Sequence, residues 1–222
     1  MIPKITANKL REYLTAGSRR RKTIIKTMKQ EQGYPAQYYS DARAHIASYL
    51  SGEITQEELE NKASSLKSFQ SDNPNTTALK VASGNAIDTF IEYSDDIQIS
   101  NCIIKKGSDF ENHQITINGI LVTAKPDLIL MDTQEKNIVG CIKFSFSQSG
   151  SLKKEAAEFT ATIMKKYIEE KLSPGNKIDT KKVLIIDNPT GEIYEAPKSH
   201  TTRMKEVVAA CEEISDRWEK IS

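Results

Sequence analysis

The order of helical and strand-like segments constrains the fold of this chain more than any other feature. After residue 75, a helical segment precedes a run of strand-like segments, a long helix and a further strand. This order predicts an α/β fold with a mixed sheet covered by helices. The expected helices are Thr76–Tyr93, Ser151–Lys171 and Thr201–Ile221, and the expected strands are Ile97–Lys105, His113–Thr123, Asp127–Met131, Asn137–Phe146, Lys181–Asp187 and Glu192–Ala196.

The first third of the chain has a different texture, because its apolar residues recur at helical spacing without strand-like runs. Thr55 and Glu58 have the spacing of a capping box, which predicts that a helix begins at Thr55. Polar turn-forming residues cluster in the sequence SFQSDNPNT, residues 68–76, and indicate a linker. We therefore expect a basic helical N-terminal module at residues 1–72 and a second domain at residues 73–222.

The net charge of +1 conceals a strong asymmetry along the chain. Residues 1–30 contain nine Lys and Arg residues and one acid, a balance of +8, so the rest of the chain carries −7. Such a division favours an arm that binds a polyanion, although a solvated helix face has the same pattern. The candidate nucleic-acid-binding residues are Arg19, Arg20, Arg21, Lys22, Lys26 and, at the start of a later helix, Lys153.

Several classes of protein are disfavoured by what the sequence lacks. No stretch approaches the roughly 20 apolar residues of a membrane-spanning helix, and charges interrupt any secretory signal near the N-terminus. The three cysteines are far apart and predict neither a disulfide framework nor a zinc site. There is no glycine-rich phosphate loop of the nucleotide-binding type. We therefore expect a cytoplasmic protein that does not contact a membrane.

A charged pair stands out on two of the expected strands. In the strand 137–146, a period of two places Lys143 on one face with Val139, Cys141 and Ser145, opposite a face of Ile138, Gly140, Ile142, Phe144 and Phe146. A lysine in mid-strand is costly to bury unless it meets a carboxylate, and Asp127 on the neighbouring strand is the expected partner. The two side chains should share one sheet face, either as a structural ion pair or as part of an active site.

These residues resemble the motif of the PD-(D/E)XK nuclease superfamily. Pro126-Asp127 is followed, beyond the stretch 128–140, by Cys141-Ile142-Lys143 where that family has (D/E)-x-K. The resemblance implies a restriction-endonuclease-like αβββαβ core and metal-dependent hydrolysis of phosphodiesters, in restriction, repair or defence against mobile elements. It also implies that Asp127 binds Mg²⁺ or Mn²⁺ and that Lys143 orients or deprotonates the attacking water.

Position 141 departs from the family motif, because a thiol is a poor ligand for Mg²⁺. If the site is catalytic, another acid must complete it, and the candidates are Glu155, Glu158 and Glu92. We take Asp127, Lys143 and Glu155 as the candidate catalytic residues and Asp127, Glu155 and Glu92 as the candidate metal ligands. The alternative is an inactive nuclease-fold module that binds nucleic acid or a protein partner. DNA is the nucleic acid we expect, although no residue pattern separates it from RNA.

Overall fold

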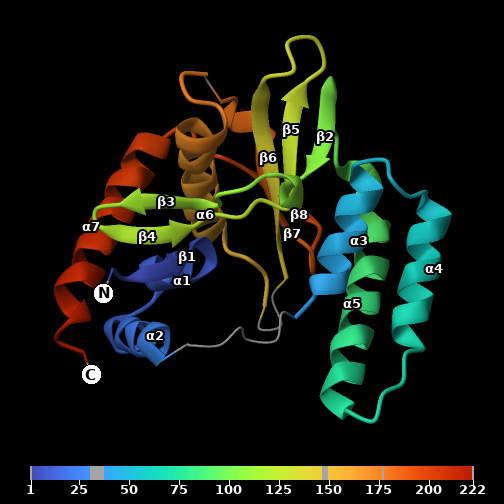
Figure 1. Cartoon of the computed structure of the whole chain (residues 1–222), viewed down its shortest axis with the longest axis horizontal. Helices are drawn as coiled ribbons and strands as arrows, with labels where there is room; N and C mark the ends of the chain where they lie inside the picture. The colour runs from blue at the N-terminus through green and yellow to red at the C-terminus, as the bar shows by residue number, and fades with distance from the viewer. Residues whose placement is uncertain (1, 31–37, 147–149, 177, 222) are drawn as a thin grey trace.

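The structure is a computed structural model that describes residues 2–30, 38–146, 150–176 and 178–221. A five-stranded mixed sheet lies between two layers of helices (Figure 1). Its strands are, in spatial order, β2 (Cys102–Lys106), β5 (Leu128–Asp132), β6 (Ile138–Ser145), β7 (Val183–Asp187) and β8 (Glu192–Glu195). Strands β6 and β7 are parallel, and the other neighbours are antiparallel. The expected α/β class with a mixed sheet is confirmed.

Helices supply the connections that the sequence order predicts. They are α1 (Ala7–Thr15), α2 (Ser18–Gln30), α3 (Ser40–Leu50), α4 (Gln56–Lys67), α5 (Pro74–Tyr93), α6 (Lys154–Tyr167) and α7 (His200–Trp218). The chain passes from α5 to β2, β5 and β6, and then crosses over through α6 to β7, as a parallel pair requires. The capping box at the start of α4 is present, with the side chains of Thr55 and Glu58 each accepting a hydrogen bond from the other's backbone N–H.

The two faces of the large sheet bury separate groups of apolar side chains. Leu128 and Ile142 point to the face covered by α3, α4 and α5, and we call this group the α5-side cluster. Ile129 and Cys141 point to the face covered by α6, α7, α1 and α2, which we call the α6-side cluster. Figure 1 shows the helices of the two clusters on opposite sides of the sheet. Alternation along each strand therefore buries both faces, as in sheets covered by helices on each side.

The segment His113–Thr123, expected as a strand with a turn or bulge signal at Asn118-Gly119, does turn there but does not join the large sheet. It is a hairpin of β3 (Gln114–Ile117) and β4 (Ile120–Thr123) that lies outside the large sheet. Asn118 and Gly119 form its turn, both with positive φ, a conformation that Asn-Gly adopts readily. The hairpin pairs instead with β1 (Lys4–Thr6), which runs parallel to β4 in a three-stranded sheet. Pairing between segments so far apart in the chain leaves no local signal in the sequence.

The predicted side-chain phase of β6 also needs a correction at its first residues. A register shift between Leu130 and Met131 of β5 changes the pairing with β6. Ile138 therefore packs in the α6-side cluster, and Val139 packs against the α5-side cluster, the reverse of the predicted faces. From Gly140 onward the predicted alternation holds, so the face assigned to Lys143 is unaffected.

The N-terminal helices share their cores with the rest of the chain. Leu10, Tyr13 and Ile25 from α1 and α2 are buried in the α6-side cluster, whereas Ile46 and Leu59 from α3 and α4 are buried in the α5-side cluster. Each cluster thus combines residues from both sides of the expected linker. The packing does not mark residue 72 as a boundary between two independent cores.

Candidate functional site

Asp127 and Lys143 lie next to each other on one face of the large sheet. The backbone N–H of Asp127 donates to the carbonyl oxygen of Ile142 at 2.9 Å, which sets Asp127 opposite Lys143 just before β5 begins. The Lys143 Nζ lies 3.2 Å from Oδ1 and 3.1 Å from Oδ2 of Asp127. Their side chains are only 11% and 10% exposed. The predicted contact on a shared face is therefore confirmed.

Arg43 of α3 is a second cation on the same carboxylate, and no pattern in the sequence predicted it. Its guanidinium lies 3.1 Å from Oδ1 and 2.9 Å from Oδ2 of Asp127, and it also donates to the carbonyl oxygen of Phe144 at 2.9 Å. The Phe144 N–H donates to Oδ2 at 2.7 Å. Arg43 also covers the ring of Phe146, 4.6 Å from the ring centroid. Within the described part of the chain, Asp127 thus accepts hydrogen bonds from three groups: Lys143, Arg43 and a backbone N–H.

The electrostatics of this cluster follow from burial and from its excess of cations. Burial alone raises the pKa of the Asp127 carboxyl, but Lys143, Arg43 and the Phe144 N–H outweigh it and hold that pKa below its ordinary value. Burial lowers the pKa of Lys143 to about 8, and Asp127 opposes that shift only in part. Asp127 is therefore ionised at neutral pH, and Lys143 loses its proton in mildly alkaline solution.

Cys141, which stands where the nuclease motif has its second acid, is buried in the α6-side cluster. Burial raises the pKa of its thiol far above the ordinary value, which keeps the sulfur protonated. A neutral, buried thiol offers a hard cation neither charge nor access. Cys141 therefore serves as a small apolar residue of the core.

A cavity of about 610 Å³ opens beside the Asp127–Lys143 pair. Its lining comes from the start of α1, from α3, from the loops on either side of the β3–β4 hairpin, and from Met164 of α6. Among the residues that the structure describes, the charged side chains of the lining are Asp127 and four cations: Arg43, Lys106, Lys125 and Lys143. Lys106 forms an ion pair with Glu53 at 2.7 Å at the edge of this region. The cavity therefore carries a positive charge that suits an anionic ligand.

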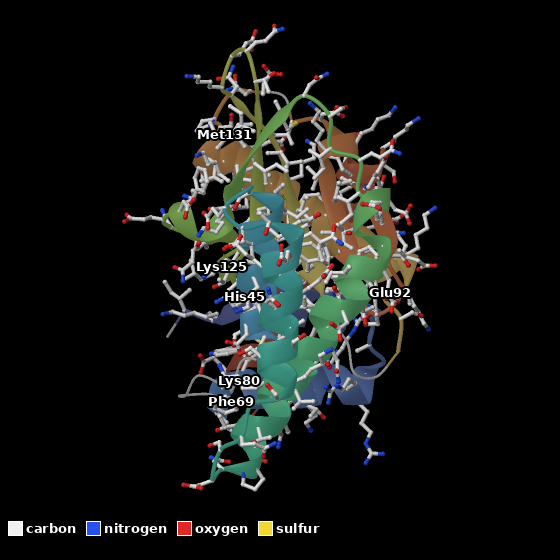
Figure 2. The ribbon with its side chains drawn as sticks, turned by 90° about the vertical axis from the view of Figure 1, so that its right-hand side faces the viewer. His45, Phe69, Lys80, Glu92, Lys125 and Met131 are labelled. Carbon is white, nitrogen blue, oxygen red and sulfur yellow. The ribbon has the colours of Figure 1, made fainter. Side chains whose placement is uncertain are left out.

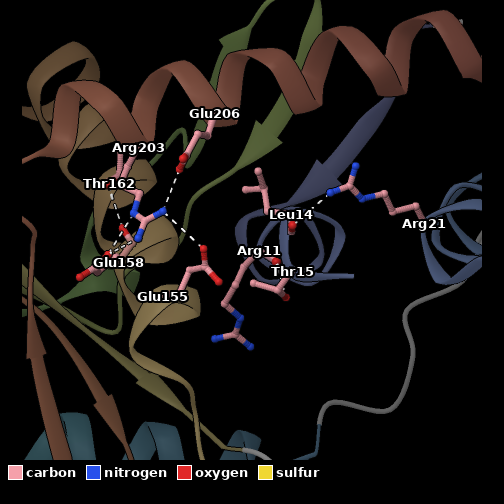
Figure 3. Close-up of polar contacts among 9 residues, drawn as sticks. All are labelled: Arg11, Leu14, Thr15, Arg21, Glu155, Glu158, Thr162, Arg203 and Glu206. Atoms are coloured by element: carbon pink, nitrogen blue, oxygen red, sulfur yellow. Dashed lines mark hydrogen bonds and ion pairs between the residues drawn. The ribbon is translucent and has the colours of Figure 1, made fainter. Parts of the chain in front are cut away.

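Glu155 and Glu158, two of the three candidates for the missing acid, are engaged elsewhere. Glu158 Oε2 accepts from Nε and from a terminal nitrogen of Arg203 on α7, at 3.0 and 2.8 Å. Glu155 accepts from the same guanidinium at 3.5 Å, and Glu206 pairs with it as well (Figure 3). Arg203 also covers the ring of Phe159. Glu155 and Glu158 therefore hold α6 to α7, which is a structural role.

Glu92, the third candidate, does not line the cavity, and Figure 2 shows it well apart from the cavity residue Lys125. Among the described residues, no group of three or more His, Cys, Asp or Glu side chains is arranged to hold a metal. The structure therefore does not bring Glu155 or Glu92 together with Asp127. A single carboxylate that already accepts from Arg43, Lys143 and a backbone N–H does not fit Mg²⁺ or Mn²⁺, which need several oxygen ligands.

The basic run of α2 divides into exposed and structural residues. Arg19, Lys22 and Lys26 are exposed and, at spacings of three and four, share one face of the helix. Arg20 is exposed and donates to Glu12 at 2.8 Å. Lys153, at the N-cap of α6, is also exposed. These five side chains have the exposure that the predicted contact with nucleic acid requires.

Arg21 is the exception, because groups of the protein already engage the guanidinium that was predicted to bind nucleic acid. Its guanidinium donates to the carbonyl oxygens of Tyr13 and Leu14 at the end of α1, and Figure 3 shows the contact with Leu14. It also pairs with Glu213 of α7 at 2.9 Å. It also covers the ring of Tyr13. Arg21 therefore satisfies carbonyls at a helix end and pairs with Glu213, and a phosphate would have to displace these contacts.

Replacing Arg19, Lys22 and Lys26 together with alanine is expected to weaken the predicted binding to DNA and to reduce its salt dependence. Each lost phosphate contact lowers the slope of log K against log salt by about 0.9. The free energy of unfolding should change by less than about 0.5 kcal/mol, because the three side chains are exposed. Fluorescence anisotropy across a salt titration measures the slope. An unchanged slope would show that this face of α2 does not contact DNA.

Comparison with known proteins does not identify a family for this chain. A scan against protein-family models finds no match to the chain, and a search of curated proteins also finds none. Within the part of the chain that the structure describes, no helix has the length and apolar character needed to cross a membrane.

Proposed function

We propose that this chain is a divergent nuclease-fold module that binds the phosphate groups of nucleic acid in the Asp127 cavity without hydrolysing them. The proposed kinship with the PD-(D/E)XK superfamily is supported by the order α5, β2, β5, β6, α6, β7, which the β3–β4 hairpin interrupts between β2 and β5, and by the contact between Asp127 and Lys143. One observation carries the functional proposal: the described residues of the cavity present four cations and one carboxylate, and that carboxylate is already bound by two of the cations.

The charges of the cavity explain why binding is favoured over catalysis. Arg43 and Lys143 pair with Asp127, so this carboxylate has its counter-charges within the chain. The remaining positive charge attracts phosphate, as Lys and Arg do without regard to base sequence. Lys125 is exposed at the cavity and is the cation best placed for first contact. We therefore propose that binding needs no metal.

Metal-dependent hydrolysis of nucleic acid, with DNA as the expected substrate, is the second candidate function. The observation in its favour is the placement of Asp127 and Lys143 on one sheet face, within hydrogen-bond distance. It needs an acid that the described residues do not bring to Asp127. Incubating the protein with plasmid, linear and single-stranded DNA in Mg²⁺, Mn²⁺ or EDTA distinguishes the two functions. Metal-dependent cleavage that Asp127→Asn abolishes would establish the nuclease and overturn the binding-only proposal.

Binding itself is tested by replacing Lys125 and Lys143. Lys125→Ala and Lys143→Met should each weaken DNA binding in EDTA by about three- to tenfold, because each removes one cation from the phosphate site. The matched control Lys171→Ala removes an exposed lysine outside the cavity and should have no effect. Equal affinities of all three variants and the parent protein would place the binding surface elsewhere.

The pH dependence provides an independent check on Lys143. Its charge is present below its pKa of about 8 and is lost as the pH rises through that value. The affinity for DNA should therefore fall several-fold between pH 7 and 9 in the parent protein. Lys143→Met lacks this charge at every pH, so its affinity should change much less over the same range.

A further inference from the structure

Tyr38 is an exposed aromatic residue at the Asp127 cavity. Its side chain lines the cavity, yet the residue is 54% exposed. In the described part of the chain, the exposed large hydrophobic residues are Ile2, Tyr38 and Phe69. The other described aromatic rings are buried or half-buried, so a ring held in solvent beside a cationic cavity needs an explanation.

The backbone next to Tyr38 holds it in that position. Tyr39 has a positive φ in the left-handed region, which is costly for an aromatic residue. The Tyr39 ring stacks on Phe146 with a centroid separation of 5.1 Å and an interplanar angle of 17°. Arg43 lies against the same Phe146 ring. The turn thus anchors Tyr39 on Phe146, beside Arg43. The Tyr38 ring lies with its centroid 6.3 Å from that of Tyr39 and lines the cavity while it stays partly exposed.

The depth of the cations indicates which form of nucleic acid fits. The side chains of Lys143 and Arg43 are only 11% and 24% exposed, so a phosphate must enter the cavity to reach them. In an intact duplex, the phosphates lie on the outside of a stiff double helix and the bases are stacked in its interior. A single strand bends into a recess and turns its bases outward, where they stack on aromatic rings.

We infer that the cavity takes single-stranded nucleic acid, with a phosphate among Arg43, Lys125 and Lys143 and an adjacent base stacked on Tyr38. This inference rests on the proposed phosphate-binding function and adds the form of the nucleic acid. Stacking on an aromatic ring does not depend on base identity, because every base has a π-face. The site therefore discriminates between single strands and duplexes, and does not read sequence.

The test compares three fluorescent probes in EDTA: a short oligothymidine, a duplex of equal length, and an abasic oligonucleotide with the same number of phosphates. The parent protein should bind the oligothymidine about tenfold more tightly than the abasic probe and more tightly than the duplex. Tyr38→Ala should remove the preference over the abasic probe, whereas Tyr38→Trp should keep it. The control Phe69→Ala removes an exposed ring that lies outside the cavity, apart from Lys125 in Figure 2, and should leave the preference intact.

The outcomes separate this inference from the function on which it rests. If Tyr38→Ala and the parent protein bind all three probes alike, while Lys125→Ala weakens all of them, stacking is wrong and phosphate binding stands. A preference for duplex would also overturn the inference. If no probe binds the folded parent protein, both proposals fail. Tyr38 is exposed, so circular dichroism should show that its variants remain folded.

Discussion

Replacing Asp127 with asparagine is expected to lower the free energy of unfolding by about 3–5 kcal/mol, the usual cost of removing one partner from a buried ion pair. The substitution keeps the size of the side chain but leaves Lys143 and Arg43 without a counter-charge, in a site where the Asp127 side chain is only 10% exposed. For a chain of this size, the midpoint of thermal unfolding should fall by roughly 6–20 °C. Differential scanning calorimetry measures both effects.

Two controls make this prediction specific. Asp88→Asn removes an ion pair with Lys67 whose side chains are 43% and 38% exposed. It should cost less than about 1 kcal/mol. The double variant Asp127→Asn/Lys143→Met should recover part of the lost stability, because it removes one of the uncompensated charges. A loss below about 1 kcal/mol in Asp127→Asn would mean that solvent or another group neutralises the two cations.

The contribution of Asp127 to the free energy of unfolding should decrease as the pH falls. Its pKa is lower in the folded protein than in the unfolded chain, so its contribution is complete above the ordinary carboxyl pKa of about 4. That contribution is lost as the pH falls through the lowered pKa. Asp127→Asn should therefore lose less stability than the parent protein when both are acidified below about pH 4.

Replacing Gly107 with alanine is expected to destabilise the protein by about 3 kcal/mol or more and to abolish the proposed binding of phosphate at the cavity. A Cβ atom at residue 107 would lie 2.1 Å from the carbonyl oxygen of Pro126, a backbone atom that cannot rotate away. The Gly107 N–H donates to the carbonyl oxygen of Asp127 at 2.8 Å. Any shift that relieves the clash therefore moves Asp127 relative to Lys143.

Urea denaturation of Gly107→Ala and of a matched glycine variant tests this prediction. Gly17→Ala is the control, because a Cβ atom there meets nothing within 4 Å and the backbone is not in the left-handed region. It should be neutral or stabilise the protein by up to about 1 kcal/mol, through the entropy of the unfolded chain. Similar stabilities of the two variants would show that the loop at Gly107 adjusts freely.

The sequence predicted those parts of the fold that depend on local patterns. The capping box at Thr55 and the alternation along β6 from Gly140 onward identified an element and a sheet face correctly. That alternation also placed Lys143 beside Asp127. Patterns of this kind are readable because a helix start and a strand each impose a fixed spacing on neighbouring residues.

The remainder depends on which distant segments meet, and no local spacing records that. Arg43 lies 84 residues from Asp127 on a helix whose pattern showed only a buried face. Glu155 and Glu158 have the residue type of metal ligands, but their partner is Arg203 of α7. In the sequence, Arg21 cannot be distinguished from the other residues of the basic run, whereas in the structure it contacts the end of α1. Acids and bases on helices reveal their charge in the sequence, but not their partners.

The packing of α1 and α2 against α7 and the residues after it has a consequence for synthesis. Arg21 of α2 pairs with Glu213, and Lys29 donates to the carbonyl oxygen of Ile221, each across 192 residues. Because a ribosome releases N-terminal segments before C-terminal ones, α1 and α2 emerge long before these partners exist. The apolar residues of α1 and α2 lack part of their core until α7 has been synthesised. We therefore expect these two helices to pack fully only after the last helix of the chain has been made.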